Sequence, residues 1–287
     1  MERGVTKHQW EQLLAAKSLI KRRRDVYLAQ WAPDSLSRYC QKVAVELTNR
    51  VNHVACSLSA VALLNLPHPY TTGWSRESVY IAGPRSRTAS IRRNPGWDLI
   101  ETPWGWSTDL LATAAVVAAD LPLPHALIVT DAVARRIANS EDRFYLASDE
   151  CLSSVRRRLT ETADLPAMRL ANPAAESPAE SFYRGNMIEY GFREPRCGVP
   201  RQGATGAQFF VDLLLDEFAI EVDGRVKYDD IDVLIAEKQR EDDLRRMGLD
   251  FLRPWAEDVF DQPIKEMEKL RSSYPQAYPH LGITTVV

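Results

Sequence analysis

The sequence predicts an α/β protein. Apolar residues recur at helical spacing through much of the first two thirds of the chain, whereas residues 209–228 form two short apolar runs around an acidic turn. The composition, with 45% hydrophobic and 26% charged residues, is ordinary for a globular domain. A chain of 287 residues is long enough for two domains, and one large domain is the alternative.

The amino-terminal segment is basic. Residues 5–17 are predicted to form a helix with Thr6 as its N-cap, and the run IKRRRDVYLA at residues 20–29 follows it. A helix followed by a basic β-hairpin is the second half of a winged helix-turn-helix, and a solvated charge run beside an ordinary helix is the alternative interpretation. The side chains expected to contact nucleic-acid phosphates are Lys21, Arg22, Arg23 and Arg24.

The middle of the chain is predicted to be mainly helical. Apolar spacing indicates helices within residues 36–66, from Ser107 to Asp120 and over about 124–138, with a strand at 78–83. The segment AMRLANPAAESPAES at residues 167–181 is rich in Ala, Pro and Ser, so we expect a linker and a domain boundary there.

A further helix is expected to follow the predicted linker. Ser177 is its N-cap and Pro178 its first residue, where a missing N–H costs nothing. The helix carries Glu180 in its first turn and runs to about Tyr190. Residues 193–207 are rich in Pro and Gly and are predicted to form a loop.

The run FFVDLLLDEFAIEVDGRVKY predicts a β-hairpin. If its turn centres on residues 216–217, Leu215 lies opposite Phe218, and Asp212 therefore lies opposite Glu221. Directly opposed residues of antiparallel strands lie about 5 Å apart and share a face. The hairpin therefore holds two carboxylates close together.

A third acid joins this pair. Asp223 falls on the same face as Glu221, because side chains alternate along a strand. Carboxylates held this close repel each other unless a cation or a proton lies between them. The three acids Asp212, Glu221 and Asp223 therefore predict a site for a hard metal ion such as Mg²⁺.

The chain after the hairpin continues the α/β pattern. Asp230 is expected to cap a helix that runs to Met247, followed by a strand at residues 250–255 and a helix over about 257–273. The order of elements and acids resembles the PD-(D/E)xK nuclease superfamily, and within it the bacterial proteins related to very-short-patch-repair endonucleases. The likeness covers roughly residues 174–260. The matching positions are Glu180-Ser181, Asp212, Glu221-Val222-Asp223-Gly224, Lys227 and Glu237-Lys238-Gln239-Arg240-Glu241.

This resemblance implies a restriction-endonuclease-like α-β-β-β-α core that hydrolyses DNA, with RNA as an alternative substrate. It also implies a Mg²⁺ or Mn²⁺ ion, which neutralises developing charge and lowers the pKa of an attacking water. Asp223 stands where the family has its strand lysine, so Lys227 or Lys238 is expected to act on the water instead. The implied metal ligands are Asp212, Glu221 and Glu180.

The amino-terminal half resembles the AbiEi antitoxins of type IV toxin–antitoxin systems. The likeness lies in GVTKHQWEQLLAAKSLIKRRRDVYLA at residues 4–29 and in HVACSLSA at residues 53–60 with the nearby LLNLP. Lys17 and Asp25 replace glycines of the family pattern, so only a partial winged helix is expected. The chain is thus predicted to contain a partial winged-helix-like DNA-binding segment, an AbiEi-like α+β region and a nuclease-like domain, at residues 1–32, 33–170 and 171–287.

Two functions follow as hypotheses. The first is a metal-dependent DNA endonuclease in phage defence or mobile-element biology. The second is a non-catalytic DNA-binding regulator or antitoxin-like protein that has a degenerate nuclease fold and a toxin or defence-system partner. A homodimer is compatible with the first hypothesis, since cutting both strands needs two sites.

Simpler features narrow the class of protein. The chain has no apolar run of about eighteen residues, which a membrane helix needs, and its first ten residues lack the apolar core of a signal peptide. A cytoplasmic protein with no membrane partner is therefore expected. The four cysteines are widely spaced, which predicts buried, reduced thiols and no zinc site. The net charge of −3 argues against a protein that coats nucleic acid.

Overall fold

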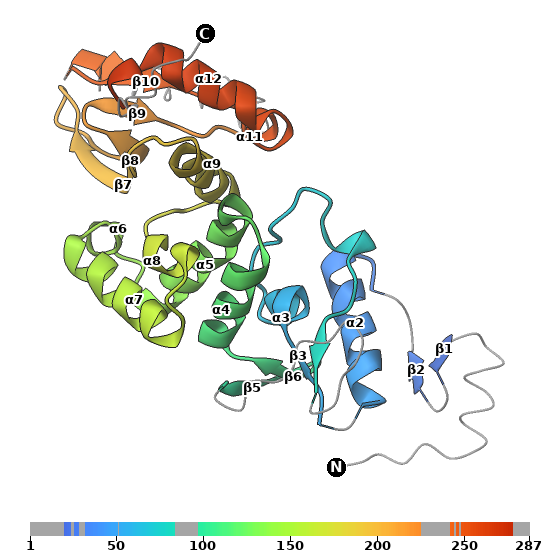
Figure 1. Ribbon diagram of the computed structural model, residues 1–287. Coiled ribbons are helices and arrows are strands. Elements are labelled where there is room, and N and C mark those ends of the chain that lie inside the picture. The colour runs from blue at the N-terminus through green and yellow to red at the C-terminus, as the bar shows by residue number, and fades with distance from the viewer. Residues whose placement is uncertain are drawn as a thin grey trace, which may run out of the picture. The chain divides into compact units, whose positions relative to one another are not determined.

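The computed structural model describes residues 20–23, 26–28, 32–50, 52–83, 97–224, 242–243, 245–246 and 248–277. The contacts divide the chain into two compact units, Met1–Thr113 and Ala114–Val287. Both units combine helices and strands, which confirms the predicted mixed α/β class (Figure 1). The predicted helix at residues 5–17 and most of the one at 230–247 lie outside the described residues.

The first unit is built around a small sheet with the strand order β4-β3-β6-β5. The elements of this unit are β1 Ile20–Arg23, β2 Val26–Leu28, α2 Ser35–Thr48, β3 Val54–Ala55, α3 Ser57–Leu63, η1 Trp74–Arg76, β4 Ile81–Ala82, β5 Leu99–Thr102 and β6 Gly105–Thr108. β3 pairs antiparallel with β4 and parallel with β6, and α3 is buried along its whole length. β1 and β2 form an antiparallel hairpin within the basic segment.

The second unit is a group of helices followed by a mixed sheet. Its helices are α4 Leu110–Asp120, which spans the division between the units, α5 Leu123–Ala138, α6 Arg143–Leu146, α7 Asp149–Thr162, α8 Pro166–Leu170, α9 Pro178–Glu189, α11 Ala256–Asp261, α12 Pro263–Ser273 and η3 Pro275–Ala277. The helix α9 packs against α11, where the rings of Phe182 and Phe260 stack with centroids 4.8 Å apart. α9 thus joins the helical group to the carboxy-terminal helices.

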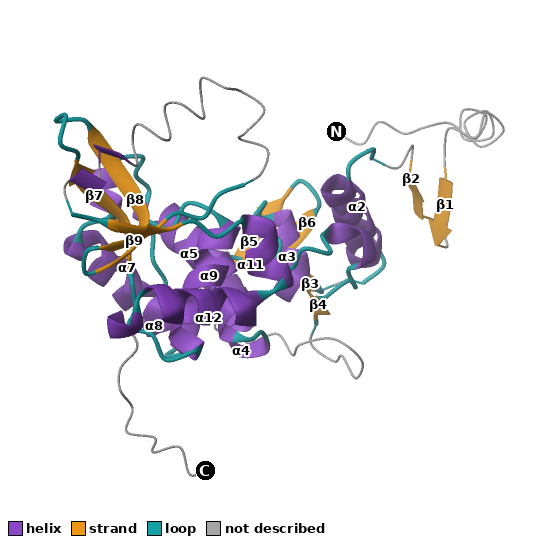
Figure 2. Cartoon of the chain, turned by 90° about the horizontal axis from the view of Figure 1, so that it is seen from above, coloured by secondary structure: helices purple, strands orange, loops and turns teal. Residues whose placement is uncertain are grey.

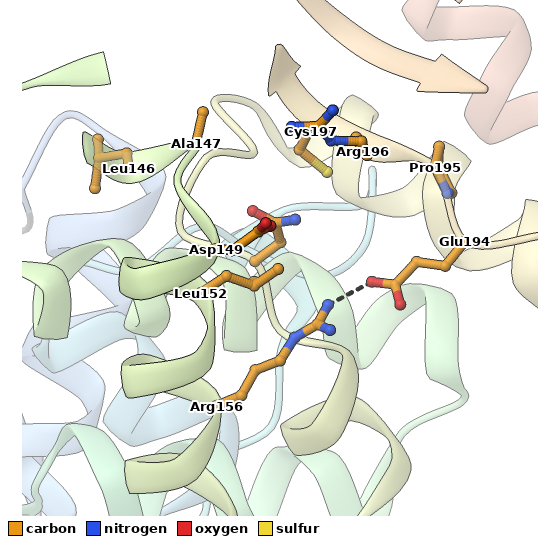
Figure 3. Close-up of a pocket in the computed structure, with 10 residues that line it drawn as sticks. Leu146, Ala147, Asp149, Leu152, Arg156, Glu194, Pro195, Arg196 and Cys197 are labelled. Carbon is orange, nitrogen blue, oxygen red and sulfur yellow. Dashed lines mark hydrogen bonds and ion pairs between the residues drawn. The ribbon is translucent and has the colours of Figure 1, made fainter. Parts of the chain in front are cut away.

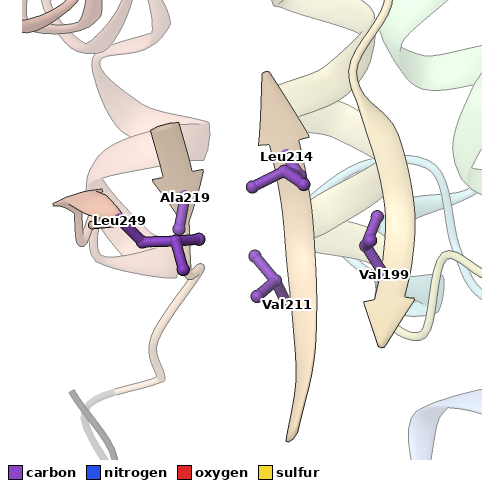
Figure 4. Packing of buried hydrophobic residues seen from close by; sticks show 5 residues of the cluster. All are labelled: Val199, Val211, Leu214, Ala219 and Leu249. Atoms are coloured by element: carbon purple, nitrogen blue, oxygen red, sulfur yellow. The ribbon is translucent and has the colours of Figure 1, made fainter. Parts of the chain in front are cut away.

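The sheet of the second unit carries the predicted site. Its strands are β7 Arg196–Gln202, β8 Gln208–Leu215, β9 Phe218–Ile220 and β10 Asp250–Leu252, in the order β10-β9-β8-β7. β7, β8 and β9 form an antiparallel meander, seen side by side in Figure 2, and β10 runs parallel to β9. The predicted hairpin register is confirmed, because Leu215 pairs with Phe218. The core of this sheet is the apolar cluster of Val199, Val211, Leu214, Ala219 and Leu249 (Figure 4).

One element of this sheet contradicts the sequence prediction. Residues 193–207 were expected to form a loop, but Arg196–Gln202 is the strand β7. Pro200 pairs with Phe210 of β8 and is tolerated because β7 is the edge strand of the described sheet, where a missing N–H breaks no second ladder. Proline and glycine therefore mark a sheet edge here.

Two further segments differ from the prediction. The helix expected from Ser107 begins at Leu110, because Ser107 belongs to β6 and pairs with Ile100 of β5. The predicted linker at residues 167–181 lies inside the second unit, where it includes most of α8 and the start of α9. Its alanines at 171, 174 and 175 are buried. The contacts therefore divide the chain well before the predicted boundary at residue 170.

The prediction of buried, reduced thiols is confirmed, since Cys40, Cys56, Cys151 and Cys197 are all buried and free. Of the helices in the described ranges, none has the length and apolar character needed to cross a lipid bilayer.

Candidate functional site

Glu180 is fixed at the start of α9. Ser177 caps the helix by accepting the N–H of Glu180 at 3.1 Å, with Pro178 at the first helical position, as predicted. In return, Glu180 Oε2 accepts the main-chain N–H of Glu176 at 2.9 Å, a variant of the capping box. The residue is only 5% exposed. Its carboxylate is therefore held in place by the helix cap and largely shielded from water.

Asp212 lies on β8, where the pairing with β9 ends. The ladder stops at Leu213–Ile220, and one further step of the same register places Asp212 opposite Glu221, as the sequence predicts. Asp212 Oδ2 accepts the main-chain N–H of Val222 at 3.0 Å. This half-buried carboxylate is thus anchored to the chain that carries Glu221.

Glu180 and Asp212 interact directly through their charges. Burial and the neighbouring Asp212 carboxylate raise the pKa of Glu180 to about 8. The hydrogen bond from Glu176 lowers this pKa but does not offset the two larger effects. At neutral pH Glu180 therefore tends to hold a proton, and a cation placed between the two groups would favour its ionised form.

The chain after β9 remains extended alongside β10. The N–H groups of Glu221 and Asp223 donate to the carbonyls of Leu252 and Pro254, both at 3.0 Å. Since both N–H groups point toward the same neighbouring strand, the two side chains project from one face, as predicted. Both residues are buried, at 3% and 5% exposed. Asp223 also forms an ion pair with Arg253, whose Nη1 lies 3.2 Å from Asp223 Oδ2.

Arg253 was not among the residues predicted from the sequence. The run DFLRPW was assigned to a strand, and pairing that strand in parallel with β9 would have brought Arg253 level with the end of the hairpin. Lys227, Lys238 and Arg24 lie outside the described residues, so their predicted roles stay predictions. For Lys21, Arg22 and Arg23 the structure gives the backbone of β1.

The two carboxylates fit a small hard cation. Within the described ranges, no group of three or more His, Cys, Asp or Glu side chains is placed to hold a metal ion. Mg²⁺ is usually bound through one or two carboxylates together with waters and substrate phosphate. Glu180 and Asp212 supply that number of carboxylates, so the donor set suits Mg²⁺ or Mn²⁺ without a complete protein cage.

A separate pocket in the second unit is less suited to chemistry. It has a volume of about 150 Å³ and lies between α7 and the start of β7 (Figure 3). Arg156 on its wall pairs with Glu194 and donates to the carbonyls of Ala171 and Leu170 at 3.0 and 3.2 Å. Burial raises the pKa of the nearby Cys197 thiol to about 12, which leaves it a poor nucleophile. The hydrogen bonds from Arg156 therefore stabilise the end of α8.

Comparison with known proteins adds no relative. No protein-family model, curated protein or solved structure matches this chain. The geometry of the carboxylates is therefore the basis for a functional assignment.

Proposed function

We propose that this protein is a metal-dependent endonuclease that hydrolyses phosphodiester bonds in DNA. The observation that carries the proposal is the buried carboxyl group of Glu180, fixed in the first turn of α9 and close enough to Asp212 of β8 for the Asp212 carboxylate to raise its pKa. The succession of α9, the β7–β9 meander and a parallel β10 supports it, because it agrees with the order expected from the nuclease resemblance.

Each residue has a role in this proposal. A bound Mg²⁺ or Mn²⁺ would neutralise charge on the phosphate and lower the pKa of the attacking water. Glu180 and Asp212 would hold the ion, and the N–H groups of Glu176 and Val222 orient their carboxylates. Glu221 lies opposite Asp212 in the register, and its predicted role as a further ligand would require its carboxylate to move toward the ion. A lysine, Lys227 or Lys238, orients the water.

Arg253 adds a positive charge to that of the proposed metal ion. Asp223 occupies the position of the family's strand lysine, and the guanidinium of Arg253 lies against it. A guanidinium presents several N–H donors in a fixed plane that suits phosphate oxygens. We assign Arg253 to stabilising the charge of the scissile phosphate.

The test is a nuclease assay on duplex DNA, single-stranded DNA and RNA with Mg²⁺ or Mn²⁺. We expect wild-type cleavage to disappear on chelation and in the variants Asp212→Ala and Glu221→Ala. The matched control is Asp216→Ala, which removes an exposed acid from the turn of the same hairpin. Cleavage by both site variants at the wild-type rate would rule out the proposal.

A second candidate function is DNA binding without turnover. It is favoured by the β1–β2 hairpin, in which Lys21 pairs with Tyr27 inside the basic segment. In that case DNA affinity should fall steeply with salt, because phosphate contacts release counterions. Replacing Arg22, Arg23 and Arg24 together by Ala should then lower both the affinity and its salt dependence. An unchanged salt dependence would exclude this role for the hairpin.

A further inference from the structure

The short helix α6 exposes two neighbouring aromatic side chains. Phe144 is 53% exposed and Tyr145 is 38% exposed, although both are large apolar residues. Single exposed apolar residues are common on protein surfaces and need no explanation. Phe144 is different, because its ring is held by neighbours instead of projecting alone.

Phe144 belongs to a small structured surface, here named the aromatic platform and made of Arg143, Phe144 and Phe210. The rings of Phe144 and Phe210 meet edge to face, with centroids 4.9 Å apart and planes at 70°. The guanidinium of Arg143 lies 4.2 Å from the centroid of the Phe210 ring. Asp142 caps α6 by accepting the N–H of Phe144 at 2.9 Å. The half-exposed ring is therefore preorganised.

The aromatic platform lies beside the candidate site. Phe210 precedes Asp212 by two residues on β8, a separation of roughly 7 Å along a strand. Arg143 Nε lies 2.8 Å from Glu176 Oε1, and Glu176 in turn donates its N–H to Glu180. Both proposed metal ligands are thus linked to the platform by short, direct paths.

The charges next to the platform suit an anionic polymer. Glu176 Oε1 also lies 3.6 Å from Arg135 Nη2, so two guanidinium groups share one carboxylate. One carboxylate can neutralise only one of the two cations. The second positive charge can pair with a backbone phosphate of a nucleic-acid strand that runs from the platform toward Glu180 and Asp212.

We infer that the aromatic platform stacks an unpaired nucleobase of the strand that enters the candidate site. This inference rests on the proposed function, because it names the substrate form as single-stranded or locally opened nucleic acid. Every base has a π-face, so aromatic stacking binds single strands with little sequence preference. In a paired duplex the faces of the bases are stacked on each other. An aromatic ring can therefore stack only on the terminal base pairs of the duplex.

The experiment measures binding of a fluorescein-labelled oligo(dT) and of its duplex with oligo(dA), by anisotropy in EDTA. Phe144→Ala should weaken single-strand binding about tenfold, the size of one stacked base. Phe144→Leu, which keeps apolar bulk without a π-face, should weaken it equally, whereas Phe144→Trp should bind at least as tightly as wild type. Ile264→Ala, which truncates another exposed apolar side chain on α12, is the matched control.

The outcomes separate this inference from the proposed function. The inference would be overturned if Phe144→Leu bound single strands with wild-type affinity. It would also be overturned if Phe144→Ala lost affinity for single strand and duplex equally. The slope of log Kd against log salt should not change in Phe144→Ala, because no cation is removed; a changed slope also counts against stacking. Asp212→Ala should bind single strands normally but cut nothing. If it cuts, the proposed function fails while the platform stands.

Discussion

Helix α9 carries two buried charged residues one turn apart, and the charges of their neighbours differ. Arg184 is fully buried and forms an ion pair with Asp131, in which its Nη2 donates to both carboxylate oxygens, at 2.8 and 2.9 Å. It also donates to the carbonyl of Leu170 at 2.8 Å. Glu180, in contrast, faces Asp212, a group of its own sign.

The contrast separates a charge that stabilises the fold from a charge that strains it. A buried ion is tolerated when an opposite charge and hydrogen bonds replace the water it loses. Arg184 has an oppositely charged partner and hydrogen bonds through both terminal nitrogens, and it ties α9 to α5. Its buried Nε nevertheless has no hydrogen-bond partner among the described residues, and burial also raises the pKa of Asp131. Glu180 instead faces a like charge, and its raised pKa is the sign of that strain. Strongly perturbed carboxylates beside a like charge are typical of functional sites.

The largest expected effect comes from breaking the satisfied pair. Arg184→Met leaves Asp131 buried without its partner, which should lower the free energy of unfolding by about 3–5 kcal/mol. The double variant Arg184→Met with Asp131→Leu removes both charges and should lose less. Urea unfolding measures both. A double variant less stable than the single one would show that the pair is not a matched charge pair.

An exposed ion pair supplies the control for that experiment. Arg193 and Asp216 have side chains that are each 52% exposed. Arg193→Met should change the free energy of unfolding by no more than about 1 kcal/mol, because solvent screens exposed pairs. A loss as large as that of Arg184→Met would mean that burial does not set the difference.

The strained pair should give stability the opposite dependence on pH from that of an ordinary salt-bridged acid. Glu180 has a pKa of about 8 in the fold against an ordinary value of 4.5, so between these values the folded protein holds a proton that the unfolded chain has released. The free energy of unfolding must therefore fall as pH rises through this range. Glu180→Gln should remove that part of the fall. Unfolding measured in EDTA across this range, with identical slopes for variant and wild type, would contradict the raised pKa.

A divalent cation should relieve the same strain. In the presence of Mn²⁺ at a hundred times its Kd, the wild type should gain about 2.7 kcal/mol of stability, and the gain should be absent from Asp212→Asn. Differential scanning calorimetry with and without the ion measures it. Asp216→Asn should respond like the wild type, and equal stabilisation of all three proteins would place Mn²⁺ elsewhere.

These two regions also differ in how far the sequence predicts them. The cap at Ser177 and the pairing of Leu215 with Phe218 follow from local patterns, and the structure has both. The pair of Asp131 and Arg184 joins residues 53 positions apart, through a packing of α5 on α9 that no local pattern encodes. The proximity of Glu180 to Asp212 was suggested by the nuclease resemblance and not by spacing.

Other parts of the site escaped prediction for physical reasons. β7 was missed because Pro200 and its neighbouring glycines indicate a loop, whereas an edge strand accepts them. Arg253 was missed because its contact depends on a parallel pairing between β9 and β10, which lie about thirty residues apart along the chain. Strand pairing across such a distance needs the whole sheet.

The smallest expected change in stability concerns the ion pair of Asp223 and Arg253, which has features of both the Arg184 pair and the Glu180 pair. Asp223 has an oppositely charged partner, as Asp131 has, but it lies two residues after Glu221, and the side chain of Arg253 is 21% exposed. Arg253→Met should therefore lower the free energy of unfolding by only about 1 kcal/mol. If Arg253 also stabilises the scissile phosphate, the same variant should lose much of the cleavage activity, and Arg253→Lys should recover part of it because the charge returns without the planar donors. A variant that loses stability but cleaves normally would place Asp223 and Arg253 with the structural pair of Asp131 and Arg184.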